Sequence, residues 1–411
     1  ILPNLSSAMA LISACSSSAS SLSKRIFCVT PGDYTAVGKI RLTTSGTATA
    51  KRYIRYFDPA NPSSTVHPVR QTKRATVRQL AFEGADHVVI DRLHFREPDQ
   101  TRVTVVHFKP DTGSTDSILQ NLLVEGGGVG SGQVGFSATN DRNVLQFSVV
   151  RNTIVSPGSD NHCVHLSQSV RGTRVVANEI YNCAGDNLQL APGVYDGTII
   201  ADNDMYNETA YVSVSENGID IKGGGSKGNI VRIEGNRFFN LGGMGGTGGS
   251  PGAIDFSNND QIVVGYISFR GNILFDNILP WTTNSSTEAG LFQHLSIVGN
   301  VIYKATVAAI QPVKKPTNIE IYYNTIIDVA QGAKWLHGIP MSQDVMCNVI
   351  INGGGADSGA SGTTADYNAY YSTPGRVMDP GTHDVVVSNA NDSKNASYTF
   401  TYKRLTNPSS Y

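Results

Sequence analysis

The 411-residue chain has little charge: Asp, Glu, Lys and Arg make up 16% of it, and its formal net charge is -1. It therefore lacks the basic excess of a nucleic-acid-binding protein. It also lacks a long apolar run, since the longest one, around Ala8 to Ala14, is far too short to cross a bilayer. We expect neither a nucleic-acid partner nor a membrane span.

Cysteines are few, and the spacing of the five fits no zinc site. Cys15 and Cys28 flank a Ser-rich stretch and could close a terminal disulfide, with unpaired buried thiols as the alternative. The chain starts at Ile1 with neither Met nor a basic n-region, which is typical of a processed product. We therefore expect a secreted protein, extracellular or periplasmic.

Glycine and small polar residues are abundant. The chain has 42 Gly and a hydrophobic content of 40%, which is too high for a disordered protein. Many Asn, Ser, Thr and Val residues accompany the glycines. This composition favours β structure with many turns.

A phrase recurs along the chain: alternating apolar residues, then Asn, one variable residue and more apolar residues. Because one such unit cannot bury its apolar face alone, stacked units predict a solenoid, here a right-handed parallel β-helix. Asn tolerates the left-handed backbone of a tight turn, and stacked amides can bond in a ladder. The copies end at Asn152, Asn178, Asn203, Asn236, Asn272, Asn300, Asn324 and Asn348, with weaker copies at Asp91 and Asn121.

The ends of the chain differ from the repeat. Residues 1–30 contain a helix-compatible stretch, Asn4 to Ser23, which predicts a helical cap over the open end of the solenoid. The β-helix is expected over 31–355 and a C-terminal cap and tail over 356–411. No linker divides the chain, so we predict one all-β domain.

A second apolar alternation predicts a column of outward side chains. It occurs in CVHL (163–166), NLQL (187–190), GIDIK (218–222) and AIDF (253–256), and GLFQ (290–293) is expected to continue it. Side chains alternate between the two faces of a strand, and neighbouring strands lie about 4.8 Å apart. If the apolar residues face inward, the outward column contains His165, Gln189, Asp220 and Asp255. The longest coils and the Gly-rich segment 241–252 flank this region.

Acidic residues of adjacent coils predict a calcium site. Hard cations prefer several oxygen ligands, mostly carboxylates. Asp220 and Asp255 would repel each other unless a cation or a shared proton intervened. The alternative is a solvated surface on which Lys222 pairs with one aspartate. The predicted ligands are Asp186, Glu216, Asp220 and Asp255.

Lys222 is the predicted general base, two residues beyond Asp220 on the same outer face. The free pKa of lysine is about 10.4, so a neighbouring cation must lower it for work near neutral pH. Asp220 is predicted beside it in the catalytic site, with His165 as substrate ligand or alternative base. The predicted substrate-binding residues are His162, Gln189, Arg174, Arg232, Tyr211 and Trp281, although the two arginines also fit an exposed surface and the tyrosine also fits a core.

The Asn-ended coils, with ENGIDIKGG (216–224) and GDNLQL (185–190), resemble the pectate-lyase-like and chondroitinase-B-like parallel β-helix polysaccharide lyases. This resemblance implies calcium-assisted β-elimination on an acidic polysaccharide. In the chondroitinase-B and alginate-lyase branch, acidic residues precede a catalytic Lys, as Glu216 and Asp220 precede Lys222. Where that branch places an Arg on the next coil, this chain has GAIDFSN (252–258), without Arg.

Together these observations predict a lyase that cleaves a uronic-acid-containing polysaccharide. A uronate C5 proton lies alpha to a carboxylate, so neutralising that carboxylate stabilises the carbanion-like transition state. One alternative is a glycoside hydrolase with Asp220 and Asp255 as acid and base. Another is a non-catalytic carbohydrate-binding spike or adhesin, because fold alone does not decide function. We expect a monomer, with a trimer as the alternative.

Overall fold

The computed structural model describes most of the chain between Ile12 and Val387. The described residues are 12–14, 26–61, 66–97, 104–126, 133–151, 162–167, 169–212, 215–241, 252–256, 264–275, 281–283, 292–305, 308–310, 318–330, 334–336, 343–352, 355–356, 363–371 and 385–387. Among them, no helix is long and apolar enough to cross a membrane.

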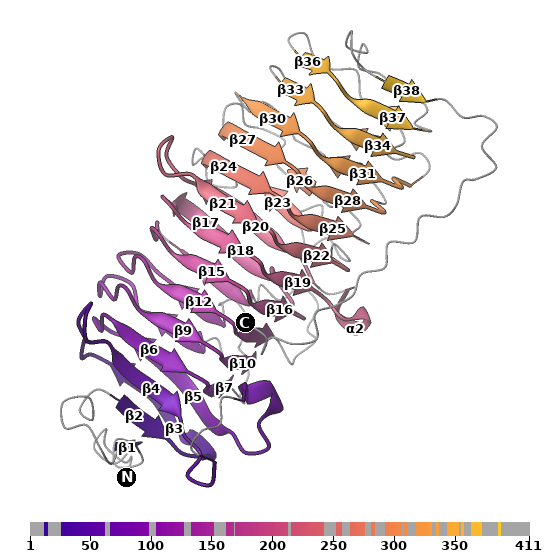
Figure 1. Ribbon diagram of the computed structural model, residues 1–411. Coiled ribbons are helices and arrows are strands. Elements are labelled where there is room, and N and C mark those ends of the chain that lie inside the picture. Colours follow the sequence, from indigo (N-terminus) through magenta and orange to yellow (C-terminus); the bar gives the residue numbers. More distant parts are fainter. Residues whose placement is uncertain are drawn as a thin grey trace.

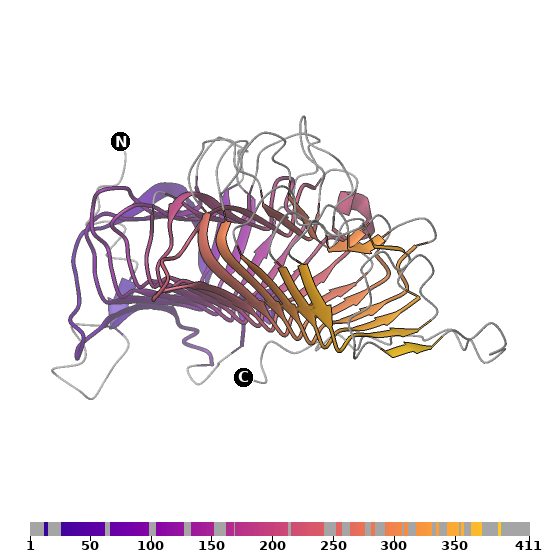
Figure 2. The same cartoon turned by 90° about the horizontal axis from the view of Figure 1, so that it is seen from above.

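Short strands stack in parallel along one axis (Figure 1), so the predicted parallel β-helix is confirmed. A typical coil contributes one strand to each of three faces, and Figure 2 shows these layers enclosing a core. The first face contains β1 (Ile12–Ala14), β2 (Ile26–Val29), β4 (Arg52–Tyr56), β6 (Val88–Asp91), β9 (Ile118–Gln120), β12 (Val144–Gln146), β15 (Arg174–Val176), β18 (Ile199–Ala201), β21 (Val231–Glu234), β24 (Val264–Arg270), β27 (Phe292–Val298), β30 (Ile319–Tyr322), β33 (Gln343–Met346) and β36 (Thr363–Asp366).

The second face follows the first after a two-residue turn. It contains β7 (His94–Glu97), β10 (Leu123–Gly126), β13 (Val149–Arg151), β16 (Glu179–Tyr181), β19 (Asp204–Tyr206), β22 (Arg237–Phe239), β25 (Ile273–Phe275), β28 (Val301–Tyr303), β31 (Thr325–Ile327), β34 (Val349–Ile351), β37 (Ala369–Tyr371) and β38 (Val385–Val387). The coils therefore extend beyond residue 355.

The third face carries the predicted column. It contains β8 (Val106–Phe108), β11 (Val134–Phe136), β14 (Val164–Leu166), β17 (Leu188–Val194), β20 (Ile219–Gly224), β23 (Ile254–Phe256), β26 (Trp281–Thr283), and then β29 (Ala308–Ile310), β32 (Lys334–Leu336) and β35 (Gly355–Ala356). Two long strands, β3 (Gly32–Leu42) and β5 (Ala75–Phe82), serve both the second and third faces. The helical elements among the described residues are the 3-10 turn Pro68–Arg70 and α2 (Thr209–Val212).

The predicted asparagine ladder is present. In each pair of neighbouring coils, the backbone N–H and the side-chain amide of one Asn donate to Oδ1 of the next, at 2.9 to 3.1 Å. Burial in the stack makes these bonds mandatory, because an unpaired amide away from water is costly. The ladder contains Asn178, Asn203, Asn236, Asn272, Asn300, Asn324 and Asn348, and Asn368 extends it.

The left-handed backbone belongs to the residue before each ladder position, which corrects the expectation that Asn itself adopts it. Ala177, Asp202 and Tyr323 are examples, with φ of 56°, 55° and 57°. Each ladder Asn instead uses its amide between coils. Glycine fills this left-handed position in three coils, where it costs no steric strain.

In the earlier coils, the sequence predicted the wrong residues for the ladder position. Asn121 has φ 52° and so occupies the left-handed position, and Asp91 ends β6 just before Arg92, which has φ 58°. In the coil before Asn178, Ser148 takes the ladder position, and its N–H donates to Asn178 Oδ1 at 3.0 Å. Asn152, the residue predicted there, lies outside the described residues.

A strand lies where part of the N-terminal helical cap was expected. Ile12–Ala14 forms β1, which pairs antiparallel with β2, with Ile12 opposite Val29. The helix prediction is therefore wrong at these positions, and the rest of residues 1–25 lies outside the described residues. The physical reason is that the first strand of a sheet presents unpaired N–H and C=O groups, which another strand satisfies directly.

Candidate active site on the third face

The predicted outward column exists. His165 is in register with Gln189, Gln189 with Asp220, and Asp220 with Asp255. Their strand neighbours Val164, Leu188, Ile219 and Ile254 are fully buried in the core, as the alternation requires.

The column continues at a different segment from the predicted one. β26 (Trp281–Thr283) pairs with β23 and places Thr282 in register with Asp255. The GLFQ segment (290–293) was expected here, but its described residues, Phe292 and Gln293, begin β27 on the first face. Apolar alternation alone does not distinguish the faces, because every strand of a solenoid carries it.

The column is buried. The exposed fractions are 7% for Gln189, 4% for Asp220 and 3% for Asp255, and His165 is half-buried. The alternative is therefore wrong in placing these carboxylates on a solvated surface, whereas the pairing of Lys222 with one aspartate that it predicted is present. Buried carboxylates are costly unless charges or hydrogen bonds compensate them.

Lys222 provides one such compensation. Its Nζ lies 3.0 Å from Asp220 Oδ2, and the two side chains are 20% and 6% exposed. The Gln189 amide donates to the same carboxylate oxygen at 3.2 Å. The lysine is thus the more exposed end of a polar chain that leads into the wall of the helix.

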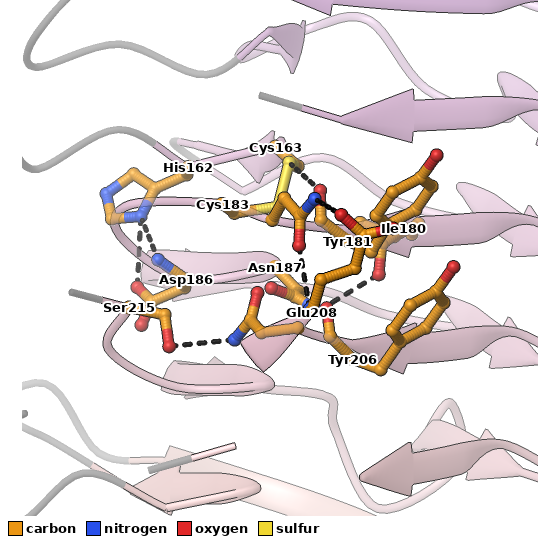
Figure 3. Close-up of a disulfide and its surroundings, with 12 residues drawn as sticks. His162, Cys163, Ile180, Tyr181, Cys183, Asp186, Asn187, Tyr206, Glu208 and Ser215 are labelled. Carbon is orange, nitrogen blue, oxygen red and sulfur yellow. Dashed lines mark hydrogen bonds and ion pairs between the residues drawn. A yellow bond between two sulfur atoms is a disulfide. The ribbon is translucent and has the colours of Figure 1, made fainter. Parts of the chain in front are cut away.

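Asp186 is fully buried and bound on both oxygens. Figure 3 shows its contact with His162. Oδ1 accepts hydrogen bonds from the backbone and side-chain amides of Asn217, at 3.2 and 2.9 Å. Oδ2 lies 3.0 Å from His162 Nδ1 and accepts from Gln189 at 3.2 Å. Asp186 therefore organises the wall behind the column, and His162, which is 4% exposed, belongs to that wall as well.

The donor set does not fit the predicted calcium site. Asp186 would have to give up its hydrogen bonds, and Asp220 Oδ2 already contacts Lys222 and Gln189. Glu216 is half-buried, and its backbone N–H donates to Gly185 at 3.3 Å. Within the described ranges, no three His, Cys, Asp or Glu side chains converge to hold a metal ion. Calcium binding remains a prediction, and the proposed reaction does not depend on it.

A disulfide that the sequence did not reveal lies beside this site. Cys163 is bonded to Cys183, which lies 20 residues further along the chain in the next coil, with a Cα–Cα distance of 5.6 Å (Figure 3). Cys163 comes just before β14, so the bond anchors the strand that carries His165. Cys28 is also disulfide-bonded, whereas its predicted partner Cys15 lies outside the described residues.

The two predicted arginines do not join the column. Arg174 and Arg232 are exposed and lie in β15 and β21 on the first face, each in register with Ile199. Both arginines lie four residues before a ladder Asn. The repeat therefore places them together on the first face, whereas Asp220 lies on the third face.

Tyr211 and Trp281 have different positions. Tyr211 is half-buried in α2; burial raises its pKa, and the charge of Glu208 raises it further. Trp281 is in register with the inward residue Ile254, and its side chain lies outside the described part.

The second face carries a polar chain that the sequence did not reveal. The His94 ring lies between two partners. Its Nδ1 is 3.0 Å from Thr76 Oγ1, and its Nε2 is 2.8 Å from Glu125 Oε2. Arg151 donates to Glu125 at 2.7 Å and to the Tyr181 hydroxyl at 2.6 Å. Burial would raise the pKa of Glu125, but the hydrogen bonds from His94 and Arg151 outweigh it and lower the pKa to about 2. The partners are far apart in sequence, so only the register reveals them.

No protein-family model and no curated protein matches the chain. Solved structures with a similar course include the catalytic unit of a GH87 α-1,3-glucanase from Streptomyces thermodiastaticus, at a TM-score of 0.49 and 13% identity, covering 89% of this chain and 64% of that one. The pectate lyase Pel9A has a TM-score of 0.45 and 13% identity, covering 78% and 73%. The alginate lyase of a Paenibacillus species has a TM-score of 0.46 and 16% sequence identity. The match covers 68% of this chain and 89% of that one. Parallel β-helix lyases, the group that the motifs resemble, are thus among the proteins similar to this chain.

Proposed function

We propose that this protein is a polysaccharide lyase that cleaves a uronic-acid-containing polysaccharide at the outer column of the third face. The observation that supports this most directly is the amine of Lys222, held 3.0 Å from Asp220 at the open end of a buried polar column. β-Elimination needs one group that removes the C5 proton and others that stabilise the negative charge which then develops.

Lys222 is the proposed base, because it is the amine of the column and is partly exposed. An ionised Asp220 favours the charged ammonium, which cannot accept a proton. Asp255 lies on the next rung, about 4.8 Å away along the stack, and two neighbouring carboxylates are relieved by sharing a proton. In the proposed reactive state Asp220 holds that proton, so its charge no longer favours the ammonium of Lys222. The neutral form of Lys222 then takes the C5 proton as the C4–O bond breaks, and water donates a proton to the leaving oxygen. His165, half-buried two rungs from Asp220, is the alternative base.

A glycoside hydrolase is the second candidate, and the pair of buried carboxyl groups supports it. Asp220 and Asp255 are register partners, 4% and 3% exposed. Glycosidases use two carboxyl groups across the scissile bond, one as the acid and one as the base or nucleophile. In that reaction Lys222 would position Asp220 rather than take a proton.

We also propose that the protein acts outside the cytosol, as an enzyme on a polymer would. The disulfide between Cys163 and Cys183 supports this, since such bonds persist in oxidising compartments.

One assay separates these functions. Pectate, alginate, glucuronan and a glycosaminoglycan are incubated with the protein, with and without Ca²⁺, and followed by ultraviolet absorbance and by reducing ends. A lyase produces an unsaturated uronide that absorbs, and a hydrolase produces reducing ends without absorbance. A protein that does neither on any polymer is not a lyase or a hydrolase of these substrates, and the proposal fails.

A further inference from the structure

A groove of about 480 Å³ lies on the first face, on a different side of the helix from the Asp220 column. It extends over β24 and β27, which are neighbours in the stack (Figure 1). The polar and aromatic residues that line it are Lys227, Tyr266, Ser268, Gln293, His294, Ser296 and Asn318. Pockets of roughly 300–1,000 Å³ are typical for small ligands.

The glycines that follow Lys222 lie against β24, the strand that carries Tyr266. Gly225 and Tyr266 exchange backbone hydrogen bonds, at 2.8 and 3.3 Å, in an isolated antiparallel bridge. A Cβ on Gly265 would lie 2.0 Å from the Gly225 carbonyl oxygen, so this approach requires glycine. The bridge fixes the tight turn that bears Lys227 beside Tyr266.

The floor of the groove is a pair of rings. Tyr266 and His294 are register partners on adjacent rungs, with ring centroids 5.8 Å apart and planes at 27°. The Asn318 amide lies 3.1 Å from His294 Nδ1, and Glu320 lies 3.5 Å from its Nε2, so the imidazole is held from both sides. Both rings are half-buried, which leaves part of the platform accessible.

We propose that this groove is a second carbohydrate-binding site, separate from the reacting column, which holds a uronate unit of the polymer. Rings present a broad apolar surface against which the C–H face of a sugar packs. Amides and hydroxyls at the rim, from Gln293, Asn318 and Ser268, match sugar hydroxyls, and Lys227 faces the uronate carboxylate. The ligand class rests on the proposed function, whereas the binding itself needs no reaction at Lys222.

Histidine NMR signals test both sites at once. The chain has nine histidines, and the His294 ring signals are assigned by their loss in His294→Gln. Tetrasaccharides of galacturonate and mannuronate are titrated into the Lys222→Ala variant, which prevents turnover, with cellotetraose as the uncharged control. We expect saturable shifts of His294 with an acidic tetrasaccharide, and affinity reduced by up to about tenfold in Tyr266→Ala.

Two further variants make the result specific. Lys227→Ala is expected to remove the preference for acidic over uncharged tetrasaccharide while leaving the other histidine signals in place. Tyr323→Ala, at an exposed residue of the turn after β30 and outside the groove, is expected to change nothing. Equal affinity at His294 in Lys222→Ala with and without Tyr266→Ala overturns the proposal.

The two proposals fail in different ways. If acidic tetrasaccharides shift only His165 and His162 and leave His294 unchanged, the groove is not a binding site, whereas the reacting column stands. If His294 shifts but no polymer is cleaved by the wild type, the groove stands and the lyase proposal fails. If no saccharide of the panel shifts His294, the second site is rejected.

Discussion

Lys222 and Asp220 form a mostly buried ion pair on the outer face of the β-helix, with Nζ 3.0 Å from Oδ2. Two positions apart on one strand, they face the same side because strand side chains alternate. Gln189 and Asp186, from the preceding coil, continue the chain of polar contacts inward. An amine, a carboxyl pair and a rigid wall are thus assembled from three coils.

Replacing Lys222 with Ala should lower the rate of cleavage by about 10²-fold or more, because the reaction loses its base. Lys222→Arg should be equally inactive, since a guanidinium does not give up its proton. Initial rates of absorbance increase measure both. Arg232→Ala, which changes an exposed cation on the first face, is the matched control and should retain full activity. Full activity in Lys222→Ala would reject the assignment.

Asp220→Asn should distinguish the two reactions. In the lyase, it removes the charge that favours the ammonium of Lys222, so the activity should rise at lower pH than in the wild type. In a hydrolase, it removes an acid or a base, and activity should fall by about 10²–10⁴-fold at every pH. The measurement is the pH profile of the initial rate for this variant and for Asp255→Asn. An unchanged profile in both would show that neither carboxyl takes part.

Asn236→Ala should reduce the free energy of unfolding by at least about 2 kcal/mol. Asn203 donates two hydrogen bonds to Asn236 Oδ1, and all of these groups are buried, so the substitution leaves donors without acceptors. Urea unfolding measures the loss. The matched control is Asn229→Ala, at an exposed turn residue, which should stay within about 0.5 kcal/mol. Equal stability of the two variants would contradict the ladder's role.

Acid should destabilise the fold between pH 6.5 and 4 through His67. Burial lowers its pKa from 6.5 to about 4, and the charge of Arg70 acts in the same direction. Its Nδ1 accepts from the Val69 N–H at 3.3 Å, and Nε2 lies 3.1 Å from the Phe147 carbonyl, which suits a neutral ring with Nε2–H donating.

The sign of this effect follows from proton binding. Between pH 6.5 and 4 the unfolded chain binds a proton at His67 and the folded chain does not, so stability falls as the pH falls. The loss is roughly 3 kcal/mol across this window. Unfolding free energies of wild type and His67→Asn at several pH values measure it, and the variant should show a shallower slope. Parallel slopes would show that another group is responsible.

Removing the disulfide with Cys163→Ala and Cys183→Ala should cost about 3 kcal/mol of stability, as expected for a closed loop of about 20 residues. Activity should fall as well, because Cys163 precedes the strand of His165. Thermal unfolding and initial rates of the double variant measure both effects. The control is Cys347→Ala, which changes a free cysteine. A double variant with wild-type stability would show that stacking alone holds this coil.

The sequence alone predicted the β-helix, the ladder from Asn178 to Asn348 and the column from His165 to Asp255. Period-two alternation and a recurring Asn are local signals, so they survive in a single sequence wherever coils are regular. These signals gave wrong predictions where the coils are irregular. Ser148 takes the place of Asn in one ladder position. The column continues at β26 rather than at residues 290–293.

Only the tertiary structure decided what surrounds the column. It placed Arg174 and Arg232 on another face, bound both oxygens of Asp186, joined Cys163 to Cys183, and stacked Tyr266 against His294. These relationships join residues about 20 to 60 positions apart, and loop lengths that vary from coil to coil set which of them meet. Alternation along one strand determines which side a residue faces, whereas its partners depend on how the coils stack.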